Sequence, residues 1–240
     1  MQSSRTSQLQ AGPVGPKLMG VTLPGFNAGD LESVRRGFEN APPCFLQQAW
    51  QAEAAANFAP AAVRAGWRHN SFLVYAELTD ADIFTQASGL NQRTWELGDA
   101  FEIFLRPDGQ EAYVEFQVTP NNQRLQLRYA NTAALNRARK TGSLADALIP
   151  GQAFRSKTWI DDKNSCWHVF AEIPAQVVCD SNDSLEGNRW HFSFSRYDYT
   201  QGVDEPVISS TSPHAEANFH SQKEWGVIQF ERGRTRGVHD

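Results

Sequence analysis

Three short runs of alternating apolar and polar residues lie close together in the middle of the chain, at 99–105, 111–118 and 123–129. Such alternation is typical of β-strands that are buried on one face only. Turn-forming residues separate the runs, first Pro107-Asp108-Gly109 and then Pro120-Asn121-Asn122. The stretch therefore predicts a three-stranded antiparallel meander with one apolar face and one polar face.

The lengths of the two turns predict how the strands pair. If residues 107–110 form a four-residue loop, Phe104 lies opposite Tyr113 and Glu102 lies opposite Glu115. Carboxylates in that position have Cβ atoms roughly 5 Å apart and repel each other. We expect the arginines of the third strand on the same face, where they offset this repulsion. The predicted polar face comprises Glu102, Tyr113, Glu115, Gln117, Arg124, Gln126 and Arg128. The alternative interpretation is a solvated ladder of charges.

The rest of the chain carries further strand signals and little helix. Strand-like runs lie at 17–26 (a first, edge strand), 62–67, 72–79, 153–160, 165–173, 189–199 and 224–231. One stretch, 130–149, is compatible with a helix. We predict an all-β fold, a single antiparallel β-sandwich that is jelly-roll-like and immunoglobulin-like in outline, with one short helical segment. The domain is expected over 18–231, between flexible tails at 1–17 and 232–240.

Composition argues against several classes of partner. The net charge of −5 gives no basic footprint for nucleic acid. The sequence has no apolar run near 18 residues, so no membrane span is expected. The first ten residues lack the apolar core of a signal peptide. Nothing in the sequence indicates an oligomeric state.

Two long loops are expected, at 80–98 and 200–223, and loops of this length are usually functional. The first places Trp95 directly before the meander. Asp80, Asp82 and Asp99 lie in or beside it and form a candidate calcium site, because carboxylates and loop carbonyls suit this hard cation. Hydrogen bonding in turns and caps is the alternative role for these three residues.

Taken in order, these segments resemble carbohydrate-binding module family 9 and the related DOMON-like sandwiches. The likeness covers 44–230 and is most specific in the spacing of Trp95, Asp99 and Glu102, followed by the hairpin. The later Glu-Ile-Pro and Ser-x-x-Arg segments, at 172–174 and 193–196, keep the same order. The resemblance implies a jelly-roll-like sandwich with calcium sites and a carbohydrate ligand, associated with carbohydrate catabolism. It favours a location outside the cytoplasm if a leader has been removed.

The resemblance also implies particular site residues. In family members one or two tryptophans clamp a sugar ring while polar side chains hold its hydroxyls. Trp95 matches the first tryptophan, Glu102 the acidic strand residue and Arg196 the arginine of a late strand. An aromatic face suits the C–H face of a sugar, and charged side chains suit its hydroxyls. With the polar face of the meander added, the predicted ligand site is Trp95, Glu102, Tyr113, Glu115, Gln126, Arg128 and Arg196.

The chain departs from the family pattern at one position. Binding members tend to carry a second tryptophan in a loop that here reads Ile208-Ser209-Ser210-Thr211-Ser212-Pro213. Trp225 precedes the last strand, where the family has a packing aromatic, and we expect it in the core. The clamp therefore lacks one tryptophan in this sequence.

Three other functions were weighed against carbohydrate binding. Glu102 and Glu115 could serve a glycosidase that retains anomeric configuration, which needs carboxyls roughly 5–5.5 Å apart. A DOMON-like haem site needs axial Met or His ligands. The only methionines, Met1 and Met19, lie outside core strands, and His168 and His191 are read as structural, so no haem is expected. The third possibility is a structural or protein-interaction sandwich whose sugar site has decayed.

Overall fold

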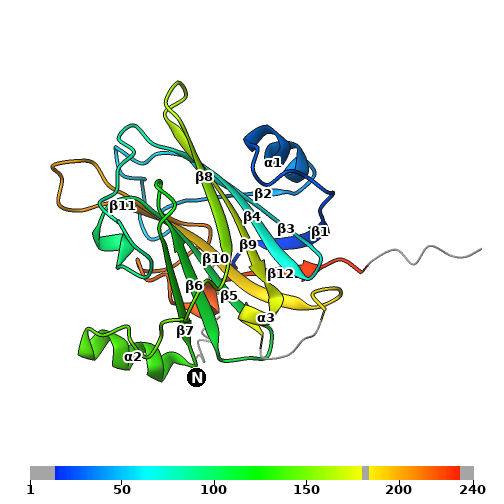
Figure 1. The fold of residues 1–240 in the computed structure, drawn as a ribbon. Helices are drawn as coiled ribbons and strands as arrows, with labels where there is room; N and C mark the ends of the chain where they lie inside the picture. The colour runs from blue at the N-terminus through cyan, green and yellow to red at the C-terminus, as the bar shows by residue number, and fades with distance from the viewer. Residues whose placement is uncertain (1–13, 180–183, 233–240) are drawn as a thin grey trace, which may run out of the picture.

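The computed structural model describes residues 14–179 and 184–232, which form a sandwich of two twisted β-sheets (Figure 1). The first sheet has the order β7 (Arg124–Tyr129), β6 (Tyr113–Val118), β5 (Ala100–Pro107), β10 (Arg189–Asp198), β12 (Gly226–Phe230) and β1 (Lys17–Thr22). The second continues from β1 through β3 (Ala61–Arg68), β4 (Ser71–Thr79), β9 (Cys166–Pro174) and β8 (Arg155–Asp161). Two short strands, β11 (Val207–Ser210) and β2 (Pro43–Phe45), pair with β10 and β3. The predicted all-β sandwich is confirmed, and most of the two expected tails lies outside the described residues.

Strand β1 joins the two sheets. Its first four residues pair in parallel with β12, and Val21 and Thr22 pair in parallel with β3. The prediction of an edge strand over 17–26 was therefore wrong, because β1 has a partner on each side and ends at Thr22. Gly66 on β3 permits the close approach. A Cβ at this position would lie 2.7 Å from Leu23 Cγ and 2.8 Å from the carbonyl oxygen of Val21.

The main core fills the space between the two sheets. Odd-numbered residues of β5 and even-numbered residues of β10 face inward, where they meet the inward faces of β4 and β9. Phe101, Phe194 and Trp167 are fully buried there. Burial of one such large side chain contributes about 1.5–3 kcal/mol to folding. The alternation in the sequence thus identified the apolar face of these strands.

The register of β5 and β6 differs from the prediction by two residues. Phe104, not Glu102, lies opposite Glu115, and Glu102 lies opposite Gln117. The reason is the connection, in which the last pair is Leu105 with Val114. Strand β5 stays paired with β10 as far as Pro107, and the turn to β6 is centred one residue later than predicted.

Strand β7 is turned over relative to the prediction. Thr119 and Gln123 close a three-residue turn, in which Asn122 has a φ of 62°. A turn with an odd number of residues exchanges the two faces of the strand that follows, because side chains alternate with period two. Leu127 therefore lies opposite Glu115, and the arginines of β7 lie on the other face. The expectation that they share a face with the two glutamates was wrong.

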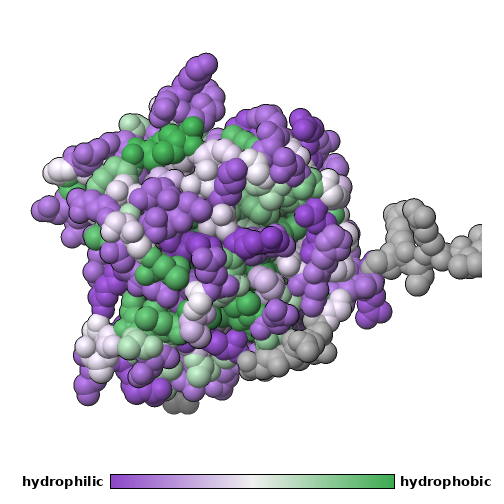
Figure 2. Space-filling view, in the orientation of Figure 1, coloured by the Kyte–Doolittle hydropathy of each residue, from purple (hydrophilic) through white to green (hydrophobic). Residues whose placement is uncertain are grey.

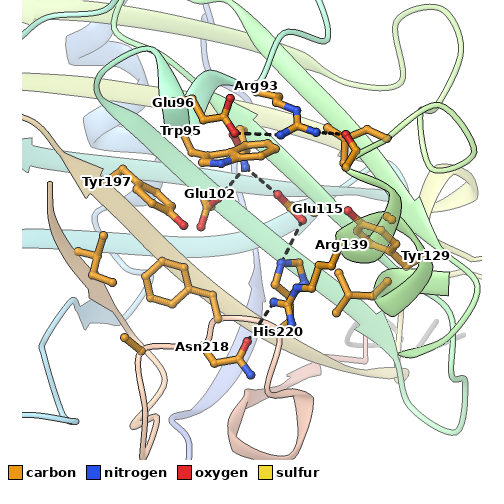
Figure 3. A pocket seen from close by; sticks show the side chains of 18 residues that line it. Arg93, Trp95, Glu96, Glu102, Glu115, Tyr129, Arg139, Tyr197, Asn218 and His220 are labelled. Atoms are coloured by element: carbon orange, nitrogen blue, oxygen red, sulfur yellow. Dashed lines mark hydrogen bonds and ion pairs between the residues drawn. The ribbon is translucent and has the colours of Figure 1, made fainter. Parts of the chain in front are cut away.

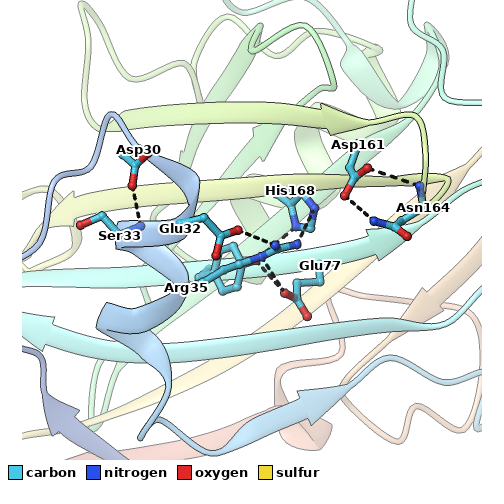
Figure 4. A network of polar contacts seen from close by, with 9 residues as sticks. Asp30, Glu32, Ser33, Arg35, Glu77, Asp161, Asn164 and His168 are labelled. Carbon is cyan, nitrogen blue, oxygen red and sulfur yellow. Dashed lines mark hydrogen bonds and ion pairs between the residues drawn. The ribbon is translucent and has the colours of Figure 1, made fainter.

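Each sheet is covered on its outer face by a helix. Helix α1 (Leu31–Phe38) packs Val34 and Phe38 on the second sheet, and Arg35 donates hydrogen bonds to Tyr75 and Glu32 (Figure 4). Helix α2 (Thr132–Thr141) covers β7 on the first sheet, and a third, one-turn helix, α3, spans Ala175–Val178. Only α2 lies in the stretch predicted to be helical. The sequence analysis assigned neither helix nor strand to the segment that contains α1.

The face of the molecule seen in Figure 2 is largely hydrophilic, with apolar side chains in separate patches. Within the described residues, no helix combines the length and the apolar character needed to cross a lipid bilayer.

The close contact at Gly66 gives a stability prediction. Gly66→Ala should lower the free energy of unfolding by about 1–3 kcal/mol, because the added methyl group overpacks the junction between β1 and β3. Gly89→Ala is the matched control, since the nearest atom to its new Cβ would be 3.9 Å away, on the side chain of Gln92. Urea denaturation of both variants measures the effect. Equal stabilities would contradict the close packing proposed for β1.

Candidate functional site

A cavity of about 320 Å³ lies on the outer face of the first sheet. Strands β5 and β6 supply its polar floor, α2 forms one wall, and the segments around Trp95 and residues 217–220 form the others. Figure 3 shows the carboxylates of Glu102 and Glu115 turned toward this space, with Trp95 and His220 on different sides of it. The site thus combines strands from the meander with both long loops predicted from the sequence.

The floor is built around one glutamine. The Nε2 atom of Gln117 donates to Glu102 Oε1 and to Glu115 Oε1, each at 2.6 Å. Thr94 donates its hydroxyl to Gln117 Oε1. This bond fixes the orientation of the amide, so that both N–H groups face the carboxylates. The second oxygen of each carboxylate, Oε2, has no hydrogen-bond partner among the described residues.

Burial makes both carboxyl groups hard to ionise. Glu102 and Glu115 are each 3% exposed. Desolvation raises the pKa of Glu102 well above its usual value, and the neighbouring charge of Glu115 raises it further. Desolvation also raises the pKa of Glu115, to about 7, although the Gln117 hydrogen bond and the charge of Arg139 act in the opposite direction. At neutral pH the pair therefore favours a state with fewer than two negative charges.

His220 brings a neutral ring to the cavity. Burial, with the nearby charge of Arg139, lowers the pKa of His220 to about 3. Its Nδ1 atom lies 2.8 Å from the hydroxyl of Tyr113, and its Nε2 atom lies 3.7 Å from Glu115 Oε2. Tyr113, predicted as a ligand-binding residue, is 1% exposed and stands behind His220. His220 itself was not predicted, because only the folding of the 200–223 loop brings it to the meander.

Trp95 lines the cavity as the sequence led us to expect, and it is half-buried. It lies in a short 3₁₀ turn, Thr94–Glu96, and two neighbouring side chains contact it. Tyr199 donates its hydroxyl to the Trp95 carbonyl at 2.7 Å, and the Arg93 guanidinium lies 5.7 Å from the centre of the indole ring. These contacts position the ring at the cavity while leaving part of it accessible.

Other aromatic rings line the cavity besides Trp95. The segment 208–213, where the family pattern has a second tryptophan, does not supply one. The other aromatic lining residues are Tyr129, Tyr197, Phe219 and His220. Trp225, expected in a core, is 3% exposed and packs beneath the cavity, 5.6 Å from Phe104 between ring centres. The aromatic character of the site therefore comes from β7, β10 and the 200–223 loop.

Besides Tyr113, three predicted ligand-binding residues do not line this cavity. Gln126 donates to the Gly151 carbonyl and accepts from the Ala153 amide. Arg128 donates to the carbonyls of residues 177 and 178. Both lie on the opposite face of β7, for the reason of register given above. Arg196 is fully buried at the end of the sandwich interior, on the inward face of β10.

Arg196 lies in a cluster of three carboxylates. Its Nη2 atom is 2.8 Å from Asp80 Oδ2 and 2.9 Å from Asp198 Oδ1, and its Nη1 atom donates to the Thr79 carbonyl. Asp99 completes the group, and the three carboxylates each offer an oxygen within 4.8 Å of the others. Burial raises the pKa of Asp99 to about 8 and the pKa of Asp198 to about 6, and the charge of Asp80 adds to both shifts.

This cluster is where the described residues could hold a metal ion. Its all-oxygen donor set is of the kind that calcium prefers, and three carboxylates against one arginine leave an excess of negative charge. Asp82, predicted as part of the site, lies outside it and instead accepts hydrogen bonds from Gln201 at 2.7 and 2.9 Å. The third carboxylate of the cluster is that of Asp198 instead. The prediction missed Asp198 because it is remote in sequence from the 80–98 loop.

The buried carboxyl pair predicts a pH dependence of stability. Because folding raises the pKa of Glu115 from about 4.5 to about 7, the folded state binds more protons in this interval. The free energy of unfolding should therefore fall between about pH 4.5 and pH 7, by on the order of 1–3 kcal/mol from this group.

Glu115→Gln should flatten that part of the curve, because glutamine does not titrate. The exposed Glu111 provides the control, and Glu111→Gln should leave the curve as it is in the unsubstituted protein. Urea unfolding measured across the interval tests both expectations. An unchanged slope in Glu115→Gln would assign the pH dependence to other groups.

Three solved structures of other proteins superpose on this chain. Two solved structures of a family 9 carbohydrate-binding module from Caldicellulosiruptor kristjanssonii, one with cellotriose and one with glucose, superpose with TM-scores of 0.63 and 0.60. Each is 16% identical, and the match covers 93% of this chain and 98% or 100% of the module. A candidate carbohydrate-binding protein from Bacteroides uniformis gives a TM-score of 0.69 at 16% identity, over 90% of this chain and all of the other.

At these identities the structural likeness establishes a shared fold. A comparison with curated protein sequences gives no significant match. The model of one protein family, described as carbohydrate family 9 binding domain-like, matches residues 33–232. The match spans nearly all of the sandwich and confirms the resemblance to carbohydrate-binding module family 9. The chain belongs to the carbohydrate family 9 binding domain-like family.

Proposed function

We propose that this protein binds carbohydrate without cleaving it, and that the cavity over β5 and β6 holds the sugar. One observation carries the proposal: Glu102 and Glu115 line a cavity together with Trp95, and each keeps one buried carboxylate oxygen without a hydrogen-bond partner. Buried acceptors without donors are costly unless a ligand supplies the hydrogen bonds. Sugar hydroxyls are donors of this kind, and the indole ring suits the C–H face of the sugar.

The size of the cavity favours a small ligand. Its volume of about 320 Å³ lies at the lower end of the range of small-molecule pockets, roughly 300–1,000 Å³. A site of this size suits a terminal sugar residue rather than several residues of a chain. Family membership and the ligands of the solved modules support a carbohydrate ligand and, through it, a role in carbohydrate catabolism.

The arrangement of the carboxylates favours binding over hydrolysis. A retaining glycosidase needs its acid and its nucleophile on opposite sides of the scissile bond, with open space between them. Here the Gln117 amide nitrogen lies between Glu102 and Glu115, 2.6 Å from each. It holds the position that a reacting anomeric carbon would need. The same amide instead prepares both carboxylates to accept hydrogen bonds from a ligand.

We also propose that the Asp80, Asp99 and Asp198 cluster binds calcium. Asp99 accepts the Phe84 amide at 2.6 Å and the Tyr199 amide at 2.8 Å, so the cluster joins the 80–98 loop to the end of β10. The excess of negative charge supports a divalent cation at this place. A bound ion would stabilise the loop that carries Trp95, and its role would be structural.

The sugar-binding proposal predicts a loss of affinity on truncation of Trp95. Trp95→Ala should weaken binding of glucose and cellobiose at least tenfold, because the ring that covers the sugar is removed. Isothermal titration calorimetry measures this without relying on tryptophan fluorescence. Trp159→Ala, on β8 of the other sheet, is the matched control and should leave affinity unchanged. Equal affinities of both variants and the unsubstituted protein would overturn the assignment of this cavity.

The calcium proposal predicts a metal-dependent stability. Calcium at 100 times its dissociation constant should raise the free energy of unfolding by about 2.7 kcal/mol, because the ion binds the folded state alone. Thermal unfolding with calcium and with a chelator measures the difference. Asp198→Asn should reduce the response, whereas Asp162→Asn, exposed in the turn between β8 and β9, should retain it. A chelator-independent melting temperature would rule out the calcium site.

A further inference from the structure

The floor of the cavity holds two buried carboxyl groups whose ionised form a neutral sugar would not stabilise. Glu102 and Glu115 share one amide as their hydrogen-bond donor, and that amide is itself neutral. Each carboxylate keeps one oxygen without a partner, and each side chain is 3% exposed. A neutral hydroxyl could satisfy an oxygen, but it would not stabilise the ionised form of either carboxyl group in a site of low dielectric.

The positive groups around the cavity do not neutralise this pair. Arg93 makes an ion pair with Glu96 at 2.9 Å and donates to the Gly142 carbonyl. Arg139 is exposed on α2 and reaches the Asn218 side chain at 3.3 Å. His220 contacts Tyr113 with one ring nitrogen, and the other is too far from Glu115, at 3.7 Å, for a hydrogen bond. The two arginines therefore lie at the walls and mouth, where solvent screens them.

We propose that the natural ligand is an amino sugar whose protonated amine donates to the unpartnered Oε2 atoms of Glu102 and Glu115. This inference rests on the proposed function, because it assigns the class of sugar to the same cavity. An ammonium group carries three N–H donors and a positive charge. It can donate to the unpartnered oxygen of each carboxylate and offset their repulsion at the same time. Hydrogen bonds between charged groups are also stronger than those between neutral groups.

The same geometry predicts which related sugars are rejected. N-acetylation removes the charge from the nitrogen and leaves it one N–H, so an N-acetyl sugar cannot donate to both carboxylates. It also adds volume in a cavity of about 320 Å³. A plain hexose keeps the shape but supplies a hydroxyl, with a single proton, where the amine would be. The order of affinity should therefore be glucosamine first, glucose second and N-acetylglucosamine last.

Isothermal titration calorimetry of the full chain with these three sugars at pH 7 tests the proposal. We expect glucosamine to bind at least tenfold more tightly than glucose. In Glu102→Gln and Glu115→Gln the preference should shrink to less than threefold while glucose binding persists, because one negative charge is gone. Glu111→Gln, exposed in the turn before β6, should keep the full preference. Thermal melting of each variant confirms that it is folded.

The outcomes separate this inference from the function on which it rests. If glucose binds as tightly as glucosamine or more tightly, the amino-sugar assignment fails and sugar binding stands. If none of the three sugars binds to the unsubstituted protein, both proposals fail. The comparison among sugars uses the unsubstituted chain, so the test holds even if a variant does not fold.

Discussion

A single buried arginine holds together the part of the structure on which the site depends. Arg196 is inaccessible to solvent and contacts Asp80, Asp198 and the Thr79 carbonyl. Removal of one partner from a buried ion pair of this kind typically destabilises a protein by about 3–5 kcal/mol, because a charge is left unpaired. Through this group, the end of β4 is fastened to the end of β10. Both ends of the 80–98 loop lie at this cluster, because Asp80 and Asp99 belong to it.

The contacts continue from the arginine to the cavity. Asp99, beside the cluster, accepts the backbone amide of Tyr199, and the Tyr199 hydroxyl in turn holds the carbonyl of Trp95. Thr94, the neighbouring residue, orients the Gln117 amide between the two glutamates. The position of the indole ring and the orientation of the floor are therefore set by one connected network. Such support from surrounding groups is what keeps a binding site preorganised before the ligand arrives.

The sequence predicted those features of the site that depend on neighbours along the chain. Alternation assigned Glu102 and Glu115 to the outer face of the meander, and the segment order placed Trp95 at its entrance. The sequence could not predict the face of β7. The same residues can form a turn of three residues or a turn of two or four, and these place the side chains of β7 on opposite faces of the sheet. His220 and Asp198 were missed because only long-range strand pairing brings them to Glu115 and Asp80. Helix α1 was missed although Asp30 caps it and Val34 and Phe38 have helical spacing, since eight residues give a weak signal.

The three-residue turn between β6 and β7 also explains why Glu102 and Glu115 have no arginine of β7 beside them. Had Arg124 and Arg128 faced the glutamates, two guanidinium groups would have paired with the carboxylates and filled the floor. The three-residue turn directs these arginines instead to backbone carbonyls of other segments, among them Phe154 for Arg124. It directs Leu125 and Leu127 to the outer face, where they pack with α2 against the cavity wall. Glu102 and Glu115 are consequently buried without a cation. An arrangement that lowers the stability of the free protein is expected to persist where a bound group makes use of it.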